Sequence, residues 1–419
     1  MSILIKNVLL NGTRTDVCIE STKFSKIGPA VSSQGKSAIE IDGSPFAMLP
    51  AFYNMHTHSA MTLMRGYADD IELHSWLTDH IWPLEKNLTE DHVYHGARLA
   101  ALEMIKSGTV FFNDMYFFPH GTARAADELG MRADIAPVLI DGCDPAKAGE
   151  LLAFAKRTIV RSSDYSPRVR FAVSPHAIYS GSAELLKGCA ELSQREALPL
   201  QIHVSETLTE VADSIRQFGL RPVQYLDSLG FLGPNLTAVH AVHLDDTDRS
   251  ILKERGVTIA HCPSSNMKLS SGSFDYAAAR AAGIPFVIAT DGACSNNNLS
   301  LLEEMKIASL RAKDRSGDPT VAPAREIFDM ATAHAARAAG LNAGRIEEGM
   351  LADCLLVRLD HPTLTPPGHL ISHMVYSAHP ECIDTVICDG RILMRGRKVE
   401  GEDEIVRGAN EAYRDLISR

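Results

Sequence analysis

The chain is predicted to fold as a (β/α)8 barrel that carries a small β-sandwich domain formed by both chain ends. Eight short apolar runs alternate with amphipathic helical segments through the middle of the chain, and short strands with turn signals occupy both termini. Continuous apolar strands that alternate with helices are typical of a parallel sheet covered by helices. Eight such units fit a closed barrel.

Composition and charge limit the partners that we expect. The 419 residues are 45% hydrophobic and 22% charged, which is ordinary for a globular protein. The formal net charge of -11 argues against nucleic acid or an anionic membrane surface as the main partner. No apolar run reaches the roughly 18 residues that a membrane span requires.

The cysteines and the first residues predict a cytoplasmic protein. The cysteines are scattered and form no Cys-x-x-Cys pair, which indicates reduced, mostly buried thiols. They are Cys18, Cys143, Cys189, Cys262, Cys294, Cys354, Cys382 and Cys388. The first residues show no basic segment followed by a long apolar core, so we expect no signal peptide.

Residues 1–47 are predicted to form the N-terminal part of the small β-domain. Short β-like runs at 3–5, 16–19 and 38–41 are separated by turns that Asn-Gly and Asp-Gly pairs mark. This segment is too short to build a good core alone. We therefore expect it to pair with another part of the chain.

Residues 48–348 are predicted to form the barrel. Strands are expected at 46–54, 109–114, 133–140, 169–174, 198–204, 237–242, 257–261 and 285–290. Helical segments include 91–106, 183–194, 206–218, 246–254 and 274–281. A doubly wound open sheet is the main alternative, but the glycine-rich phosphate loop typical of that fold is absent after the first strand.

Residues 349–419 are predicted to complete the small β-domain and to add a terminal helix at 402–418. Strands are expected at 352–357, 383–388 and 391–394, with a hairpin turn at Asp389-Gly390 between the last two. We expect these strands to pair with those of residues 1–47.

Four polar residues at predicted strand ends can converge on one metal ion. His56 and His58 end the first strand, and residues two apart in a strand face the same side. His203 ends the fifth strand, and Asp291 follows the eighth. The carboxyl ends of barrel strands meet on the face where chemistry occurs. Three imidazoles and a carboxylate suit Zn²⁺ or another divalent first-row metal, with one position open for water.

Taken singly, the neighbouring polar residues also have ordinary structural explanations. Asp291 could cap a helix or start a turn, and Glu206 could be a first-turn helix glutamate favoured by the helix dipole. His176 could be a loop histidine. His240 and His243 are three residues apart, so we expect at most one of them to point inward.

Short motifs surround these residues along nearly the whole chain. They are Asn54-Met55-His56-Thr57-His58, Arg65-Gly66 with Asp69-Asp70, Trp76-Leu77-x-x-x-Ile81-Trp82-Pro83-x-Glu85, Ser174-Pro175-His176, His203-x-x-Glu206-Thr207, His240-x-x-His243, His261-Cys262-Pro263-Ser264-Ser265-Asn266-x-Lys268-Leu269 and Thr290-Asp291-Gly292-x-x-Ser295-Asn296-Asn297. With these motifs the chain resembles the amidohydrolase superfamily, and within it the S-adenosylhomocysteine/methylthioadenosine deaminase group. Guanine, 8-oxoguanine, pterin and triazine hydrolases are similar at the same motifs.

The resemblance implies one metal ion held by His56, His58, His203 and Asp291, with Zn²⁺ preferred and Fe²⁺ or Mn²⁺ as alternatives. Binuclear relatives use a carboxylated lysine at the end of the fourth strand. This chain has Ser174-Pro175-His176 there. The missing lysine favours a mononuclear site and disfavours a cyclic-amide hydrolase.

The resemblance also implies catalytic roles for three residues. Glu206 is expected to carry a proton from the metal-bound water to a ring nitrogen of the substrate. His240 is expected to hydrogen-bond and orient that water, and Asp291 to accept a proton from it. These roles agree with the chemistry, because a bound metal makes hydroxide available near neutral pH and a nearby carboxylate can move the proton.

Five residues are expected to contact the substrate. By resemblance, Glu85 binds the ribose hydroxyls, while His176, Trp82, Glu206 and Asp291 also contact the substrate. The implied reaction is hydrolytic deamination of an adenine nucleoside to the inosine analogue and ammonia. Homo-oligomers are common in the family, and we expect one here.

The loop after the third strand, residues 140–145, narrows the choice of nucleoside. Relatives that accept S-adenosylhomocysteine have an arginine there, whereas this loop is acidic and has none. We therefore expect 5'-methylthioadenosine, 5'-deoxyadenosine or adenosine to be better substrates than S-adenosylhomocysteine.

Two other functions remain as alternatives. One is deamination or dechlorination of a free heteroaromatic ring such as guanine, 8-oxoguanine, a pterin or a triazine. The other is a metal-binding barrel without catalysis, against which the intact Glu206 argues. The chain lacks the His-x-Glu and Pro-Cys-x-x-Cys signature of cytidine-deaminase zinc sites.

Overall fold

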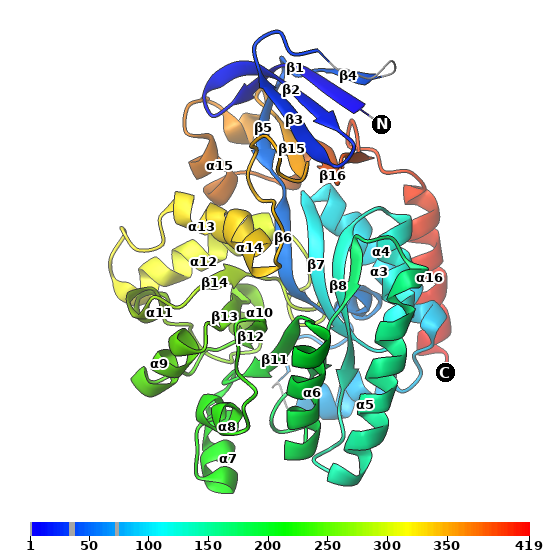
Figure 1. The fold of residues 1–419 in the computed structure, drawn as a ribbon, viewed down its shortest axis with the longest axis vertical. Helices are drawn as coiled ribbons and strands as arrows, with labels where there is room; N and C mark the ends of the chain where they lie inside the picture. Colours follow the sequence, from blue (N-terminus) through cyan, green and yellow to red (C-terminus); the bar gives the residue numbers. More distant parts are fainter. Residues whose placement is uncertain (1, 33–37, 72–74) are drawn as a thin grey trace.

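The computed structural model describes residues 2–32, 38–71 and 75–419. Figure 1 shows a barrel surrounded by helices, with a sheet from both chain ends packed against one end of it. No helix in these ranges combines the length and the apolar character that crossing a membrane requires. The predicted fold class is confirmed.

The barrel strands are parallel, and nearly all of their residues are buried. They are β6 (Phe52–Thr57), β7 (Thr109–Tyr116), β8 (Arg132–Leu139), β9 (Val169–Phe171), β10 (Ser174–Pro175), β11 (Leu200–Val204), β12 (Leu236–His240), β13 (Thr258–His261) and β14 (Phe286–Ile288). Parallel ladders run from β6 to β10 and from β11 to β14. Together, β9 and β10 occupy the place of the predicted fourth strand.

Two sets of backbone contacts close the barrel between these ladders. Parallel bridges join Val173 to Leu200 and Ala177 to His203. On the other side, the Asp291 amide donates to the His56 carbonyl at 3.1 Å. The same contacts bring the ends of β11, β14 and β6 together, which is where the candidate metal donors lie.

Helices cover the outside of the barrel and follow the predicted segments within a few residues. Those of the barrel are α2 (Trp82–Glu85), α3 (Glu90–Lys106), α4 (Pro119–Glu128), α5 (Pro145–Val160), α6 (Ala183–Glu196), α7 (Leu208–Phe218), α8 (Pro222–Ser228), α9 (Asp246–Glu254), α10 (Pro263–Lys268), α11 (Tyr276–Ala282), α12 (Leu301–Ser316), α13 (Ala324–Ala331) and α14 (Ala333–Ala338). Short 3-10 and π turns at Ser59–Met64 and Trp76–Ile81 lie in the loop after β6.

The chain ends form one sheet, as predicted. Its strands are β1 (Ser2–Leu10), β2 (Thr13–Glu20), β3 (Lys23–Gly28), β4 (Ala38–Asp42), β5 (Phe46–Pro50), β15 (Cys354–Arg358), β16 (Ile383–Cys388) and β17 (Arg391–Met394). The N-terminal β5 pairs with the C-terminal β15 in antiparallel register. Asp389 and Gly390 both have positive φ, which suits the predicted hairpin turn between β16 and β17.

The last two helices of the chain pack against helices of the barrel. They are α15 (Leu370–Tyr376) and α16 (Glu402–Ile417). In Figure 1, α16 runs along the outside of the barrel beside α3. His92 of α3 bonds Asp415 of α16 at 2.8 Å, and Arg98 bonds Glu404 at 3.1 Å.

Two predictions about the strands were wrong. The expected strand at 46–54 is two strands, because the Ala51 amide bonds Asp353 of the chain-end sheet while the next amide, Phe52, bonds Gly108 of the barrel. Both halves are apolar, so periodicity cannot reveal the change of sheet. The edge strand β3 was missed because Lys23, Ser25 and Lys26 make it polar, as exposed edges often are.

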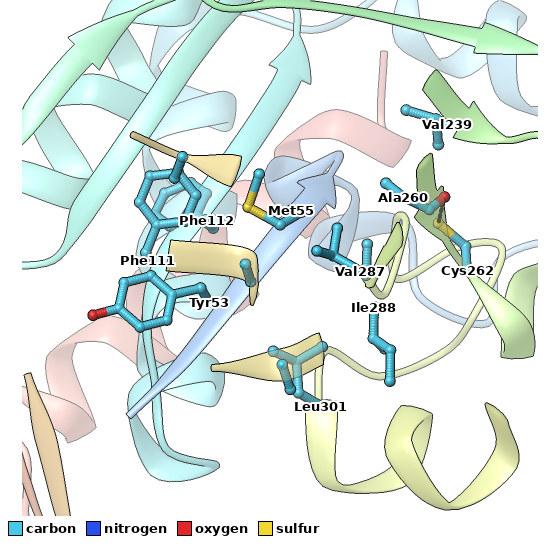
Figure 2. Close-up of a cluster of buried hydrophobic side chains, with 14 of the residues drawn as sticks. Tyr53, Met55, Phe111, Phe112, Val239, Ala260, Cys262, Val287, Ile288 and Leu301 are labelled. Atoms are coloured by element: carbon cyan, nitrogen blue, oxygen red, sulfur yellow. Dashed lines mark hydrogen bonds between the residues drawn. The ribbon is translucent and has the colours of Figure 1, made fainter. Parts of the chain in front are cut away.

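The core fills the barrel and its contacts with the surrounding helices. Figure 2 shows Tyr53 and Met55 of β6 beside Phe111 and Phe112 of β7, with Val287 and Ile288 of β14 on the other side. The rings of Tyr53 and Phe111 lie 5.9 Å apart between centroids. This packing fixes the strands whose ends carry the site.

Candidate metal and substrate site

The four predicted metal donors come together at the carboxyl ends of three barrel strands. Each of His56, His58, His203 and Asp291 offers one ligand atom, and all four atoms lie within 4.8 Å of one another. His56 is fully buried, and the other three are at least largely buried. This is the clustering that a single metal ion needs.

Hydrogen bonds orient two of the histidine rings. His56 Nδ1 lies 3.1 Å from Gln201 Oε1, and His58 Nδ1 lies 2.6 Å from the Met115 carbonyl. Both partners are acceptors, so we assign the ring protons to Nδ1. The Nε2 lone pairs then face the centre of the cluster, which is how carbonyl partners prepare histidines for metal binding.

One carboxylate oxygen of Asp291 is available to coordinate a metal ion, while the other is already hydrogen-bonded. Its Oδ2 accepts hydrogen bonds from Ser265 Oγ at 2.6 Å and Ser295 Oγ at 2.8 Å. Its Oδ1 is buried without a hydrogen-bond partner among the described residues and lies 3.2 Å from His58 Nε2. A buried carboxylate oxygen without a donor is costly unless a cation meets it.

The electrostatics of the cluster also favour a bound cation. Burial lowers the pKa of His56 to about 4, so this ring is neutral and can coordinate. Burial also disfavours charge on His58, but the nearby carboxylate of Asp291 outweighs it and raises the pKa of His58 to about 9. The carboxylate thus attracts a positive charge to this point, and the residues present fit a divalent metal ion.

Glu206 and His240 lie beside these donors. Glu206 Oε1 accepts a hydrogen bond from Ser271 Oγ at 2.7 Å, and its Oε2 lies 3.8 Å from His240 Nε2. His240 Nδ1 lies 2.9 Å from Asn266 Oδ1, which assigns the proton to Nδ1 if that amide oxygen is the acceptor. The carboxylate of Glu206 and the Nε2 of His240 therefore face the same space as the metal donors.

Backbone strain marks the same strand ends. Ser205, His240, Ala241 and Asp291 all have positive φ, from 47° to 68°. Residues other than glycine rarely adopt this conformation, and such strain is concentrated at functional sites. Here it turns the chain sharply at the ends of β11, β12 and β14, so that side chains point over the barrel.

The helix predicted at 206–218 begins two residues later than expected, so Glu206 is not part of the helix. Helix α7 starts at Leu208, because the Thr207 side chain caps it by accepting from the Glu210 amide at 3.1 Å. Glu206 lies before the cap, so it belongs to the turn after β11. Its side chain lines the pocket above the donors.

A pocket over the cluster contains all the predicted site residues except the fully buried His56. The lining residues are His58, Met61, Trp76, Leu77, Trp82, Glu85, Met115, Tyr116, Phe117, Val138, Ile140, His176, Tyr179, His203, Glu206, His240, Leu269, Asp291 and Ser295. None of these is lysine or arginine. Apart from the histidines, the charged groups are the carboxylates of Glu85, Glu206 and Asp291.

Comparisons with known proteins identify the family of the chain. A model described as the amidohydrolase family matches residues 47–393. The chain belongs to the amidohydrolase family. It is 44% identical over 99% of both chains to 5-methylthioadenosine/S-adenosylhomocysteine deaminase 1 of Archaeoglobus fulgidus, and 45% identical to 5'-deoxyadenosine deaminase of Methanothermobacter thermautotrophicus over 93% of this chain and 92% of that one.

A solved structure of the same fold is also similar over the whole chain. It is an adenosine deaminase from Xanthomonas campestris with bound zinc, with a TM-score of 0.91 and 30% identity over 100% of this chain and 99% of that one. The fold of this amidohydrolase therefore has a counterpart in a solved structure.

His243 belongs to the family motif that contains His240, but it does not line the pocket. Strand β12 ends at His240, and His243 follows in the next loop. Its Nε2 donates to the Ser271 carbonyl at 2.6 Å. The expectation that at most one of His240 and His243 points inward is confirmed.

Sequence reasoning missed several residues of this amidohydrolase site. Tyr116 donates to Glu85 Oε1 at 2.7 Å, and burial raises the pKa of that carboxyl to about 7. Tyr116 lies two residues beyond the predicted end of the second strand, so the sequence pattern does not mark it as a site residue. Ser271 follows the quoted motif that ends at Leu269, and no signal in the sequence marks it.

Proposed function

We propose that this amidohydrolase is a metal-dependent deaminase of adenine nucleosides that carry a small, uncharged 5' group. The single observation that carries the proposal is the pocket. It is lined by the metal-donor cluster, by the carboxylate of Glu206 outside that cluster, and by apolar side chains that we call the apolar wall. The names of the relatives support the same reaction, since they include 5'-deoxyadenosine deaminase and 5-methylthioadenosine/S-adenosylhomocysteine deaminase.

The proposed reaction replaces the amino group of the adenine ring with oxygen from water. A bound divalent ion would supply the Lewis acidity that makes water a nucleophile near neutral pH. Glu206 takes a proton from the attacking water and delivers it to the ring nitrogen next to the reacting carbon. Nε2 of His240 orients the water. Asp291 takes the second proton and passes it to the amino group, which leaves as ammonia.

We propose that the 5' side of the nucleoside lies against the apolar wall. Glu85 receives the ribose hydroxyls there, while Trp82 and His176 contact the substrate. Because the described residues that line the pocket include three carboxylates and no lysine or arginine, an anionic substituent finds no cationic side chain among them and is repelled. This favours 5'-deoxyadenosine and 5'-methylthioadenosine over S-adenosylhomocysteine, because the carboxylate of its zwitterionic tail would be left without a partner.

The proposal is tested by measuring the ammonia that the metal-loaded protein releases from a panel of compounds. The panel contains 5'-deoxyadenosine, 5'-methylthioadenosine, adenosine, S-adenosylhomocysteine, adenine and guanine. We expect activity on the nucleosides and a kcat/KM for S-adenosylhomocysteine at least roughly tenfold lower, from one unpaired charge. Equal turnover of S-adenosylhomocysteine and 5'-methylthioadenosine would reject the 5' preference.

Glu85→Gln separates the nucleoside reaction from the runner-up, which is deamination or dechlorination of a free heteroaromatic ring. If Glu85 holds the ribose, this variant loses activity on nucleosides and leaves any weak activity on adenine unchanged. If the free bases are the better substrates of the unaltered protein, the runner-up is correct. The fold, the donor cluster and the role of Glu206 would stand in either case.

We propose Zn²⁺ as the ion, with one ion per chain. Three imidazole nitrogens and one carboxylate oxygen suit zinc, and the structurally similar adenosine deaminase contains it. The expected result is about one equivalent of zinc in the purified protein by elemental analysis and well below half an equivalent in His203→Ala, because one of four ligands is lost. The control is His334→Ala, on α14 and outside the donor set. Unchanged metal content in His203→Ala contradicts the assignment.

We also propose that the protein works in the cytoplasm and forms homo-oligomers. The scattered, mostly buried free cysteines support the first statement. Light scattering at several protein concentrations tests the second.

A further inference from the structure

His243 lies outside the pocket, but it contacts two residues that are directly linked to Glu206. Its ring is half-buried, and its Nε2 donates to the Ser271 carbonyl at 2.6 Å. Its backbone amide donates to the Ser205 carbonyl at 2.9 Å, one residue before Glu206. The motif His240-x-x-His243 thus has one histidine in the pocket and one behind it.

Ser271 connects this ring to the Glu206 side chain. Ser271 is only 5% exposed, and its hydroxyl donates to Glu206 Oε1 at 2.7 Å. The loop approaches His243 closely at Gly272, where a Cβ would lie 2.7 Å from Nε2 of that ring. Gly272 also has a φ of 136°, so glycine is needed there for both reasons.

Glu210 fixes the backbone that carries Glu206. Its buried carboxylate accepts the amides of Ser205 at 2.9 Å and of Glu206 at 2.8 Å. Ser205 has a φ of 51°, which is strained for a residue with a side chain. The two amide bonds hold this turn, and the turn directs the Glu206 side chain over the cluster.

We propose that Glu210, His243 and Ser271 are positioning residues that give the two oxygens of Glu206 different tasks. We call these three residues the Glu206 support. Ser271 holds Oε1, so Oε2, on the side of His240 Nε2 at 3.8 Å, is the oxygen that exchanges protons with water and substrate. This inference rests on the proposed role of Glu206.

The physical benefit is a carboxylate that is already oriented before the substrate binds. Proton transfer requires heavy atoms about 2.6 to 3.2 Å apart, so a carboxylate that rotates freely spends time in unproductive positions. A hydrogen bond to one oxygen removes that freedom at no cost during the reaction. The loss of the bond should therefore lower kcat and leave KM nearly unchanged.

The kinetic test compares Ser271→Ala with Ser271→Thr, which keeps the hydroxyl, and with Ser270→Ala, an exposed neighbour. We expect kcat for 5'-deoxyadenosine to fall roughly 10- to 100-fold in Ser271→Ala, the value of a hydrogen bond to a charged group. KM and zinc content stay within about twofold, and Ser271→Thr recovers most of the loss. His243→Leu should also lower kcat. His243→Gln keeps a hydrogen-bond donor and should lower kcat less than His243→Leu does.

A second variant separates positioning from general damage. In a Glu206→Gln background, Ser271→Ala should cause no further fall in kcat, because both changes act through the same proton transfer. An equal fall in both backgrounds overturns the proposal. So does a rise in KM with kcat unchanged.

A measurement without substrate distinguishes a failure of the proposed deaminase function from a failure of the Glu206 support. Equilibrium unfolding of Ser271→Ala, Glu206→Ala and the double variant gives the coupling between the two side chains. We expect the coupling to change the unfolding equilibrium constant by about tenfold. If the protein deaminates nothing but this coupling is present, the proposed function fails and the contact stands. No coupling together with normal deamination overturns the Glu206 support alone.

Discussion

Replacing Glu206 with glutamine is expected to lower kcat for 5'-deoxyadenosine by roughly 10²- to 10⁴-fold, the usual contribution of a general acid–base group. Glutamine has the same size and can still accept from Ser271 Oγ, but it cannot take a proton from the attacking water. The four metal donors are untouched, so zinc content stays at its original value. Steady-state kinetics and elemental analysis on the same preparation check both statements.

The matched control for this variant is Glu191→Gln, an exposed glutamate on α6. It makes the same chemical change far from the pocket and should leave kcat within about twofold of the original, as surface substitutions usually do. If Glu206→Gln retains more than about a tenth of the original kcat, another group moves the proton, and Asp291 is the next candidate.

Replacing Asp353 with alanine is expected to lower the free energy of unfolding by about 3–5 kcal/mol, the cost of breaking a buried ion pair. Asp353 is fully buried where the chain-end sheet meets the barrel. Its Oδ2 accepts from Tyr53 Oη at 2.8 Å and Arg132 Nε at 2.9 Å, and its Oδ1 accepts from the Asp389 amide at 2.6 Å. Without Asp353, the guanidinium of Arg132 is left largely buried without this partner.

Denaturant unfolding of two further variants tests this explanation. Glu40→Ala breaks an exposed pair with Lys6 and should cost less than about 1 kcal/mol. The double variant Asp353→Leu with Arg132→Met removes both charges, so it should be more stable than Asp353→Ala alone. If the double variant is less stable than Asp353→Ala, the unpaired charge is not the cause of the loss.

The barrel and the metal donors could be predicted from the sequence because their signals are local. Each strand is a short apolar run, and His56, His58, His203 and Asp291 stand at or just after the ends of such runs. The rule that the carboxyl ends of barrel strands meet on one face then brings them together without further information. The structure adds the tautomers and the free Oδ1 of Asp291.

Other features depend on contacts between distant segments and could not be predicted. The division of 46–54 into β5 and β6 is set by Asp353 and Gly108, which supply partners from different sheets. The bond from Tyr116 to Glu85 joins the end of strand β7 to the end of helix α2, which no sequence periodicity relates.

His243 belongs to a motif that can be recognised in the sequence, but its contacts could not be predicted from that motif. Its spacing from His240 predicted that the two rings would not both point inward, but its partner Ser271 lies 28 residues later in the chain. Ser271 in turn contacts Glu206 across 65 residues. A role that passes through two such contacts is visible only when the loops have been folded together.

The most direct test of the proposed function is the reaction of zinc-loaded protein with 5'-deoxyadenosine in water enriched in ¹⁸O. Mass spectrometry follows the nucleoside product, and an ammonia assay follows the released amine. We predict one ¹⁸O atom in the 6-oxo product and one ammonia per product, with both formed roughly 10²- to 10⁴-fold more slowly by Glu206→Gln. Unchanged 5'-deoxyadenosine in the presence of bound zinc would contradict the proposal that this amidohydrolase is an adenine nucleoside deaminase.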